Sequence, residues 1–124
     1  MKTIGLIAHD RMKPLMVDWV KRYHDRLKNF SLVATGTTGG LVREACPDLS
    51  VELLKSGPLG GDQQAGAMIA EARMQALIFL TDPLTAMPHD VDVKALTRLS
   101  TLYDIPMACN VATADMVIAM LEPN

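Results

Sequence analysis

Residues 51–74, VELLKSGPLGGDQQAGAMIAEARM, combine three patterns that decide the fold. The apolar run Val51–Leu54 has the length of a buried strand, and the alanine-rich pattern Gln63–Met74 has the spacing of a helix. The loop between them, from Ser56 to Asp62, contains a hydroxyl, three glycines and a carboxylate. Glycines let backbone N–H groups approach an anion, and a helix N-terminus favours negative charge. The stretch therefore indicates a strand–loop–helix unit with a ligand site in its loop.

The same alternation of strand and helix extends along the whole chain. Short apolar runs predict five strands, at Thr3–Ala8, Ser31–Ala34, Val51–Leu54, Ala76–Leu80 and Pro106–Cys109. Helical spacing is found between them, in Leu15–Leu27, Leu41–Ala45, Gln63–Met74, Val91–Tyr103 and Ala114–Leu121. This order predicts an α/β fold, a three-layer α/β/α sandwich with a doubly wound sheet of about five mainly parallel strands. With 124 residues and no linker or repeat, we expect one domain over residues 1–124.

Composition excludes several classes of function. The net charge of −2 gives no support for binding to nucleic acid or a membrane surface, and only five aromatic residues are available to stack on bases. Two cysteines are too few for a disulfide framework. The apolar run Ile4–Ala8 is too short for a signal peptide, and no stretch approaches the ~20 apolar residues of a membrane span. We therefore expect a soluble, cytoplasmic protein.

Polar residues or glycines follow every predicted strand. They are His9-Asp10, Thr35–Gly39, Ser56-Gly57, Asp82 and Asn110. In an open parallel sheet the carboxyl ends of the strands share one edge, and ligands bind there. The sequence therefore predicts that these groups gather around one ligand.

The Thr35–Gly39 segment is a candidate anion cradle, since it has three hydroxyls and two glycines just before a helix. A plain turn with a threonine cap is the alternative. It lacks the endings of both the Walker loop and the dinucleotide fingerprint, so no nucleotide cofactor is indicated. Lys13 could supply the positive charge that a phosphate needs, and a solvated lysine is the alternative.

Two histidines are candidate site residues. His9-Asp10 ends a strand, and His89-Asp90 stands at a helix start with Asp92 one turn in. A metal site built on them is conceivable, but no ligand-spacing motif such as His-Glu-x-x-His is present. A helix N-terminus keeps a histidine neutral and able to polarise a carbonyl, and a merely capping His89 is the alternative.

Six motifs together resemble those of the methylglyoxal synthase family. They are His9-Asp10-x-x-Lys13, Ala34–Gly39, Leu54–Gln64, Phe79–Leu84, Pro88–Leu96 and Asn110–Ala114. They occur in the same order as in the family, and the likeness runs from Ile4 to about Leu121. Because several long motifs coincide, this is a specific signal.

The resemblance implies a carbon–oxygen lyase that converts dihydroxyacetone phosphate to methylglyoxal and inorganic phosphate without metal or organic cofactor. It implies that Asp62 is the catalytic base and that His89 acts on the substrate carbonyl, with Asp92 also catalytic. The implied substrate and phosphate contacts are His9, Lys13, Thr35, Gly36, Thr37, Thr38, Ser56, Gly57 and His89, with Asp10 and Asp82 in support. It further implies a homohexamer that phosphate inhibits.

Two other functions are alternatives to the lyase. A non-catalytic regulatory module could bind phosphorylated metabolites or nucleotides on the same fold, because a fold alone does not fix function. A metal-dependent hydrolase would lose activity on chelation. One feature also opposes the proposed base: a helix N-terminus favours the ionised form of Asp62. Desolvation and the nearby carboxylates of Asp82 or Asp92 would have to act in the other direction.

Overall fold

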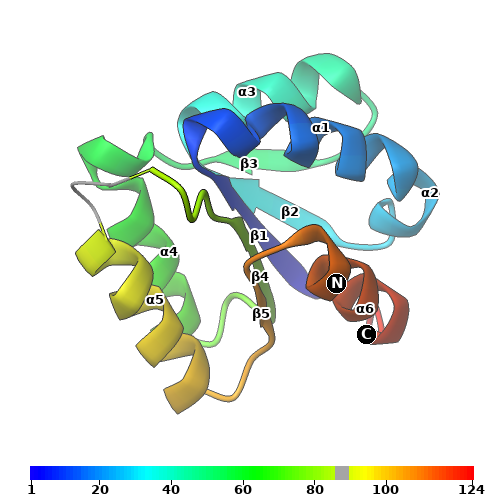
Figure 1. Ribbon diagram of the computed structural model, residues 1–124. Coiled ribbons are helices and arrows are strands. Elements are labelled where there is room, and N and C mark those ends of the chain that lie inside the picture. Colours follow the sequence, from blue (N-terminus) through cyan, green and yellow to red (C-terminus); the bar gives the residue numbers. More distant parts are fainter. Residues whose placement is uncertain (86–89) are drawn as a thin grey trace.

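The computed structural model describes residues 1–85 and 90–124, whose strands form one sheet flanked by helices (Figure 1). The strands are β1 Thr3–Ala8, β2 Ser31–Ala34, β3 Val51–Leu53, β4 Ala76–Leu80 and β5 Met107–Ala108. The α-helices of this part are α1 Lys13–Arg22, α2 His24–Leu27, α3 Gly36–Ala45, α4 Gly61–Ala70, α5 Asp90–Leu102 and α6 Val111–Met120. Two short 3₁₀ helices, η1 Asp10–Met12 and η2 Gly57–Leu59, precede α1 and α4.

The sheet has the strand order β3-β2-β1-β4-β5, and every pair of neighbours is parallel. At its centre Leu6 of β1 stands opposite Ala34 of β2 on one side and Ile78 of β4 on the other. The chain winds outward from β1 to β3 and then returns to β4 on the other side of β1. The predicted fold class is therefore confirmed, and the reversal of winding lies between β1 and β4. A parallel sheet of this kind binds ligands at the carboxyl ends of those strands.

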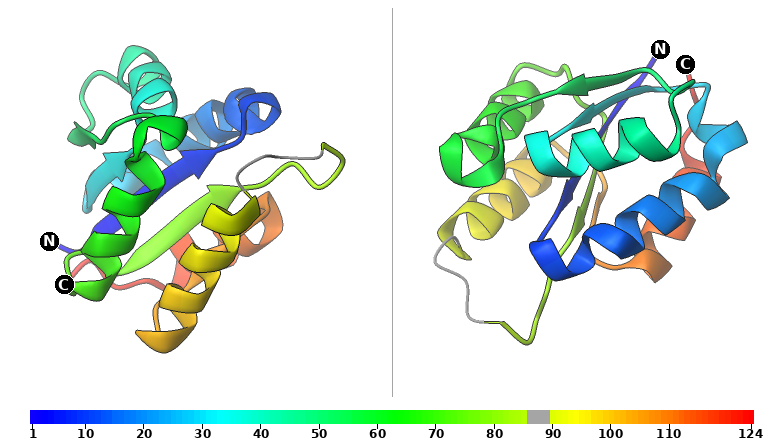
Figure 2. Two further views of the ribbon diagram at one scale, coloured as in Figure 1. Left: turned by 90° about the vertical axis from the view of Figure 1, so that its left-hand side faces the viewer. Right: turned by 90° about the horizontal axis from the view of Figure 1, so that it is seen from above.

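Helices cover both faces of the sheet (Figures 1 and 2). On one face α1, α3 and α6 pack against alternate strand residues such as Leu6 and Ile78, and on the other α4 and α5 pack against Ile7 and Phe79. The central strands β1 and β4 thus send apolar side chains to both faces, as expected for a sheet covered on two sides. Burial of such a side chain contributes about 1.5–3 kcal/mol.

The predicted helix Leu15–Leu27, whose apolar residues are spaced to form one buried stripe, is interrupted in the structure. α1 ends at Arg22 and α2 begins at His24, with Tyr23 between them outside helical geometry. Leu15, placed in the apolar stripe by its spacing, is 43% exposed, whereas Met16 and Leu27 are fully buried. The buried side of this helix is therefore predicted correctly at most positions, but not at Leu15.

All five predicted helices begin earlier than the sequence predicts: α1 and α4 by two residues, α5 by one, α6 by three and α3 by five. α3 starts at Gly36, so that most of the Thr35–Gly39 segment, the candidate anion cradle, forms its first turn. α4 starts at Gly61 and ends at Ala70, four residues before the predicted end. A left-handed Gly60 (φ +109°) precedes it and Ala72 (φ +60°) follows it. Within α4, Ala67 and Ala70 are exposed, although the helical spacing of Gln63–Met74 makes both of them candidates for burial.

The two ends of the chain meet beside the sheet (Figure 2). The Lys2 N–H donates to the Pro123 carbonyl at 3.0 Å, and the Arg26 guanidinium donates to the carbonyls of Ile118 and Leu121 at the end of α6. These contacts hold the C-terminal helix against α2. Among the residues described, no helix has the length and apolar character that a membrane crossing requires.

Candidate active site

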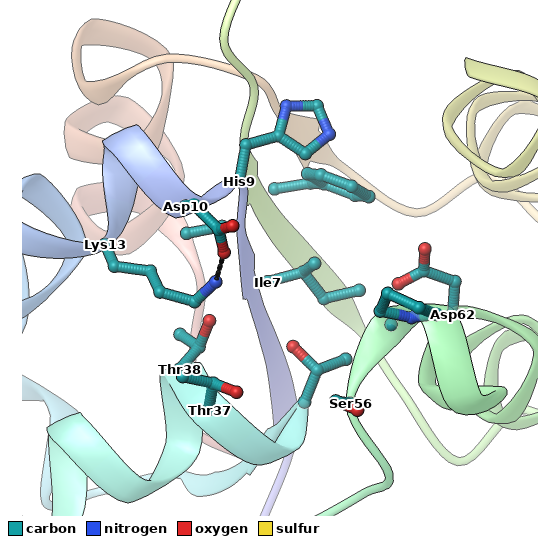
Figure 3. Close-up of a pocket in the computed structure, with 13 residues that line it drawn as sticks. Ile7, His9, Asp10, Lys13, Thr37, Thr38, Ser56 and Asp62 are labelled. Atoms are coloured by element: carbon teal, nitrogen blue, oxygen red, sulfur yellow. Dashed lines mark hydrogen bonds and ion pairs between the residues drawn. The ribbon is translucent and has the colours of Figure 1, made fainter. Parts of the chain in front are cut away.

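A cavity of about 240 Å³ opens at the carboxyl ends of the central strands (Figure 3). Nine predicted site residues line it: His9, Asp10, Lys13, Thr35, Thr37, Thr38, Ser56, Gly57 and Asp62. Figure 3 shows Lys13, Thr37 and Thr38 on one side of this space and Asp62 on the other, with Ile7 between them. The nine predicted residues, which are up to 53 positions apart in the sequence, therefore share one small enclosure, as the parallel topology requires.

The start of α3 forms one wall of the cavity. Thr35 precedes the helix in extended conformation and makes no side-chain cap, while the Gly36 N–H donates to the Lys55 carbonyl at 3.3 Å. The N–H groups of Thr37 and Thr38 belong to the first helical turn, where no carbonyl lies one turn earlier. The Thr38 hydroxyl is buried and has no hydrogen-bond partner among the described residues. This wall is therefore rich in donors that an anion can use.

Lys13 adds a positive charge beside these donors. It lies at the first position of α1, and its ammonium group forms an ion pair with Asp10 one turn earlier. The side chain of Lys13 is only 15% exposed, whereas that of Asp10 is 97% exposed. Lys13 is thus turned into the protein and Asp10 out toward water, which excludes the alternative of a fully solvated lysine.

Asp62 lies across the cavity, in the first turn of α4, and is 4% exposed. Gly57 packs directly on it: a Cβ on Gly57 would stand 3.3 Å from Oδ1 and 3.4 Å from Oδ2. The left-handed Gly60 makes the turn from η2 into α4 that brings the carboxylate there. Ile7, Phe79 and Pro58 line the same space. This apolar lining limits the access of water to the carboxylate.

His9 closes the end of the cavity nearest β4. Its Nδ1 accepts a hydrogen bond from the Asp82 N–H at 2.9 Å, and its ring meets the Phe79 ring edge to face at 5.2 Å. Because Nδ1 accepts, the neutral ring carries its proton on Nε2. His9 is buried and held in one orientation, so that it can donate from Nε2 to a polar atom.

Three predicted residues do not line this cavity in the described structure. The Asp82 carboxylate accepts from the Thr85 hydroxyl and the Leu84 N–H, and these bonds lower the pKa of Asp82 below its usual value. The N–H of Gly36 donates to the Lys55 carbonyl, and Asp92 accepts from the Gln63 amide at 2.8 Å. Asp92 lines a second cavity, of about 320 Å³, which also includes Asp62.

The remaining prediction, His89, lies outside the described residues. Within residues 1–85 and 90–124, no group of three or more His, Cys, Asp or Glu side chains is arranged to hold a metal ion.

The sequence did not point to four of the lining residues, Ile7, Ala8, Pro58 and Phe79. Three of them belong to buried strands, where an apolar residue is expected to serve the core alone. Alternation gives a partial signal, because Ile7 and Phe79 both face the α4 side of the sheet. Their place next to a carboxylate follows from the position of α4, which the sequence did not define.

The arrangement joins two chemical capacities. One wall presents an ammonium group and helix-start donors to an anion, and the opposite wall presents a buried carboxylate that can accept a proton. A substrate that carries an anion at one end and an acidic C–H at the other fits both walls at once.

The chain is similar to several known proteins over most of its length. Residues 15–109 match the family described as "MGS-like domain". The chain is 65% identical to the methylglyoxal synthase of Agrobacterium fabrum, over 94% of this chain and 92% of that protein. It is 63% identical to the methylglyoxal synthase of Rhizobium rhizogenes, over 98% and 96%. A crystal structure of methylglyoxal synthase from Elizabethkingia anophelis superposes with a TM-score of 0.89 at 48% identity, covering 95% of this chain and 77% of that one.

Proposed function

The chain belongs to the methylglyoxal synthase family of lyases, and on that premise we propose that it converts dihydroxyacetone phosphate to methylglyoxal and inorganic phosphate. The family relationship favours the lyase over the regulatory module, which no comparison supports. The observation that carries the proposal is the pairing, in one cavity, of a donor-rich anion wall with the buried carboxylate of Asp62.

The phosphate is proposed to bind between Lys13 and the start of α3. The N–H groups of Thr37 and Thr38, the Thr38 hydroxyl and the backbone of Ser56-Gly57 would hydrogen-bond its oxygens. Hydrogen bonds to charged groups contribute about 1.5–3 kcal/mol each, more than neutral ones. The product phosphate would bind to the same groups, and this supports inhibition by phosphate.

The carboxylate of Asp62 is proposed to remove a proton from the hydroxymethyl carbon of the substrate. The electron pair of that C–H bond forms the enediolate, whose oxygen needs a hydrogen-bond donor to be stable. His9 is held with its proton on Nε2 and can donate to a substrate oxygen. The resemblance assigns His89 to the carbonyl, with Asp92 beside it in the same family motif.

The enediolate then expels phosphate. The pair of its C=C bond moves to form a new C=C bond to the phosphate-bearing carbon as the C–O bond to phosphate breaks, while the hydroxyl on the former hydroxymethyl carbon gives its proton to the leaving phosphate and becomes the aldehyde. The resulting enolate takes up, at its methylene carbon, the proton that Asp62 removed and becomes methylglyoxal, so that no water is consumed. Cleavage is fastest when the breaking bond stands perpendicular to the enediolate plane. A phosphate bound by Lys13 and the start of α3 fixes the torsion about the breaking C–O bond, and such positioning can lower a barrier by up to roughly 7–11 kcal/mol.

We further propose that the protein forms a homohexamer, as the family resemblance implies.

The test is to incubate the purified protein with dihydroxyacetone phosphate and a chelator, and to measure dicarbonyl and free phosphate. The proposal expects the two products in equal amounts, with no effect of the chelator. Release of phosphate together with dihydroxyacetone would indicate a hydrolase instead. Formation of glyceraldehyde 3-phosphate would indicate an isomerase, and binding of substrate without turnover would indicate a regulatory module.

A further inference from the structure

The backbone of Lys55 joins the two walls of the cavity. Its carbonyl accepts from the Gly36 N–H at the start of α3, at 3.3 Å. Its N–H donates to the side-chain Oε1 of Gln64 in α4, at 2.8 Å. One residue of the segment between β3 and η2 is therefore bonded both to the anion wall and to the helix that bears Asp62.

The packing at this junction leaves no free space. A Cβ on Gly61 would stand 1.9 Å from the Lys55 oxygen, and a Cβ on Gly36 would stand 3.2 Å from the Ser56 nitrogen. The Ser56 carbonyl accepts from the Gly61 N–H at 3.0 Å. The starts of α3 and α4 thus both lie against residues 55 and 56, and the Gln64 amide holds this segment from the α4 side.

We propose that Gln64 is a positioning residue for the reaction: by holding the Lys55 N–H, it fixes the separation between the phosphate-binding wall and Asp62. The inference rests on the proposed function. Gln64 is exposed and does not line the cavity, so it acts through Lys55 and Ser56-Gly57 rather than on the substrate. It therefore contributes alignment, not chemistry.

The kinetic consequence follows from which contacts are lost. Without the Gln64 acceptor, the Lys55–Gly57 segment is held to α4 only by the Ser56–Gly61 hydrogen bond and the packing at Gly61, and its alignment is less well fixed. Lys13 and the first turn of α3 keep their places. A misplacement of about 1 Å can cost on the order of a hundredfold in rate. We expect kcat to fall about 10- to 100-fold and KM to change less than about threefold, because the main phosphate contacts remain.

The test compares two variants at this position. Gln64→Leu removes the acceptor, and Gln64→Glu keeps an oxygen that can accept the same N–H. For each we measure kcat and KM with dihydroxyacetone phosphate, the Kd of inorganic phosphate, the melting temperature, and hydrogen exchange of the Lys55 amide. In Gln64→Leu we expect a lower kcat and faster hydrogen exchange at the Lys55 amide. In Gln64→Glu we expect both quantities to stay close to those of the unaltered protein.

The chain offers a matched control in Gln75. Its Oε1 accepts from the Thr3 N–H at 2.7 Å and its Nε2 donates to the Ala72 carbonyl, far from the cavity. Gln75→Leu is expected to lower the melting temperature without changing kcat. The inference is overturned if Gln64→Leu keeps the kcat of the unaltered protein, loses no more than Gln75→Leu, or behaves like Gln64→Glu. If the unaltered protein does not turn over dihydroxyacetone phosphate, it is the proposed function that fails.

Discussion

The backbone of Gly57 lies directly on the carboxylate of Asp62, with room for a hydrogen but not for a relaxed methyl group between them. Gly57 also belongs to the segment that faces the anion wall. One residue thus touches the group that is proposed to take the proton and lies next to the groups that are proposed to hold the phosphate. Through this contact, the backbone at Gly57 sets the distance between the proposed base and the proposed phosphate-binding groups.

The first prediction tests this contact. Gly57→Ala places a Cβ 3.3 Å from Oδ1 of Asp62, so the carboxylate must move or turn. Since small displacements are costly for catalysis, we expect kcat to fall about 10- to 100-fold while the stability changes little. Gly40→Ala is the control, because nothing lies within 4 Å of its added Cβ and alanine favours the helix by about 0.5–1 kcal/mol. Equal kcat values for the two variants would contradict the prediction.

The second prediction concerns the buried hydroxyl of Thr38. Thr38→Val keeps the shape and removes a hydroxyl that has no partner among the described residues. Folding stability should stay the same or rise, since a buried polar group is removed. The affinity for phosphate should fall roughly tenfold to a hundredfold, measured by calorimetry. Thr101→Val, which removes a hydroxyl bonded to the Thr97 carbonyl, should leave phosphate binding unchanged.

The fold was predicted more completely than the site. β1, β2 and β4 have the predicted bounds, because apolar residues on both faces give a strong signal in a buried strand. The helix α3 was placed five residues late, since Gly36 and Gly39 are poor helix formers. The structure shows close packing at Gly39, where an added Cβ would stand 2.3 Å from the end of the Leu53 side chain and 3.1 Å from the Ala34 Cβ.

The sequence predicted which residues gather at this edge of the sheet, but not how their side chains are oriented. The positions of Lys13 and Asp62 follow from topology, because both come after strands that end at one edge. That Asp82 turns into its own loop, and that its N–H fixes the tautomer of His9, depends on local hydrogen bonds that spacing does not encode. The contact of Gly57 with Asp62 likewise follows from the turn at Gly60.

The third prediction is a pH dependence of stability far from the cavity. His24 contacts Asp48 at 2.8 Å and Asp25 at 3.1 Å, with Lys28 near Asp48 at 3.6 Å. The hydrogen bond to Asp48 raises the pKa of His24 above the usual 6.5, and the bond to Asp25 acts in the same direction. The stabilisation is therefore complete below pH 6.5 and is lost as the pH rises through the higher pKa of the folded state.

The variant His24→Gln measures this effect. Its melting temperature should lie below that of the unaltered protein by a few degrees at most near pH 5.5, and the difference should shrink as the pH rises through the raised pKa of His24. At the acid end, the His24 contact lowers the pKa of Asp48 below 3.8, so the pair is lost only below that pH. Asp25→Asn, which keeps the Asp48 contact, should retain most of the dependence. A difference that grows with rising pH would contradict the account.

The fourth prediction concerns His89, whose role follows from the family resemblance. If His89 polarises the substrate carbonyl by donating a hydrogen bond, His89→Gln should retain much more activity than His89→Ala, because glutamine still donates. The ratio of their kcat/KM values is the measurement. Equal values for the two variants would remove the carbonyl-polarising role.

The most direct measurement follows the fate of the substrate proton in Asp62→Asn. The asparagine keeps the shape of the side chain and cannot accept a proton as a base, and a positioned base typically contributes 10²–10⁴-fold. With dihydroxyacetone phosphate in deuterated water, we expect kcat to fall by about that factor and exchange at the hydroxymethyl carbon to stop, while phosphate still binds. Turnover and exchange close to those of the unaltered protein would show that Asp62 is not the base.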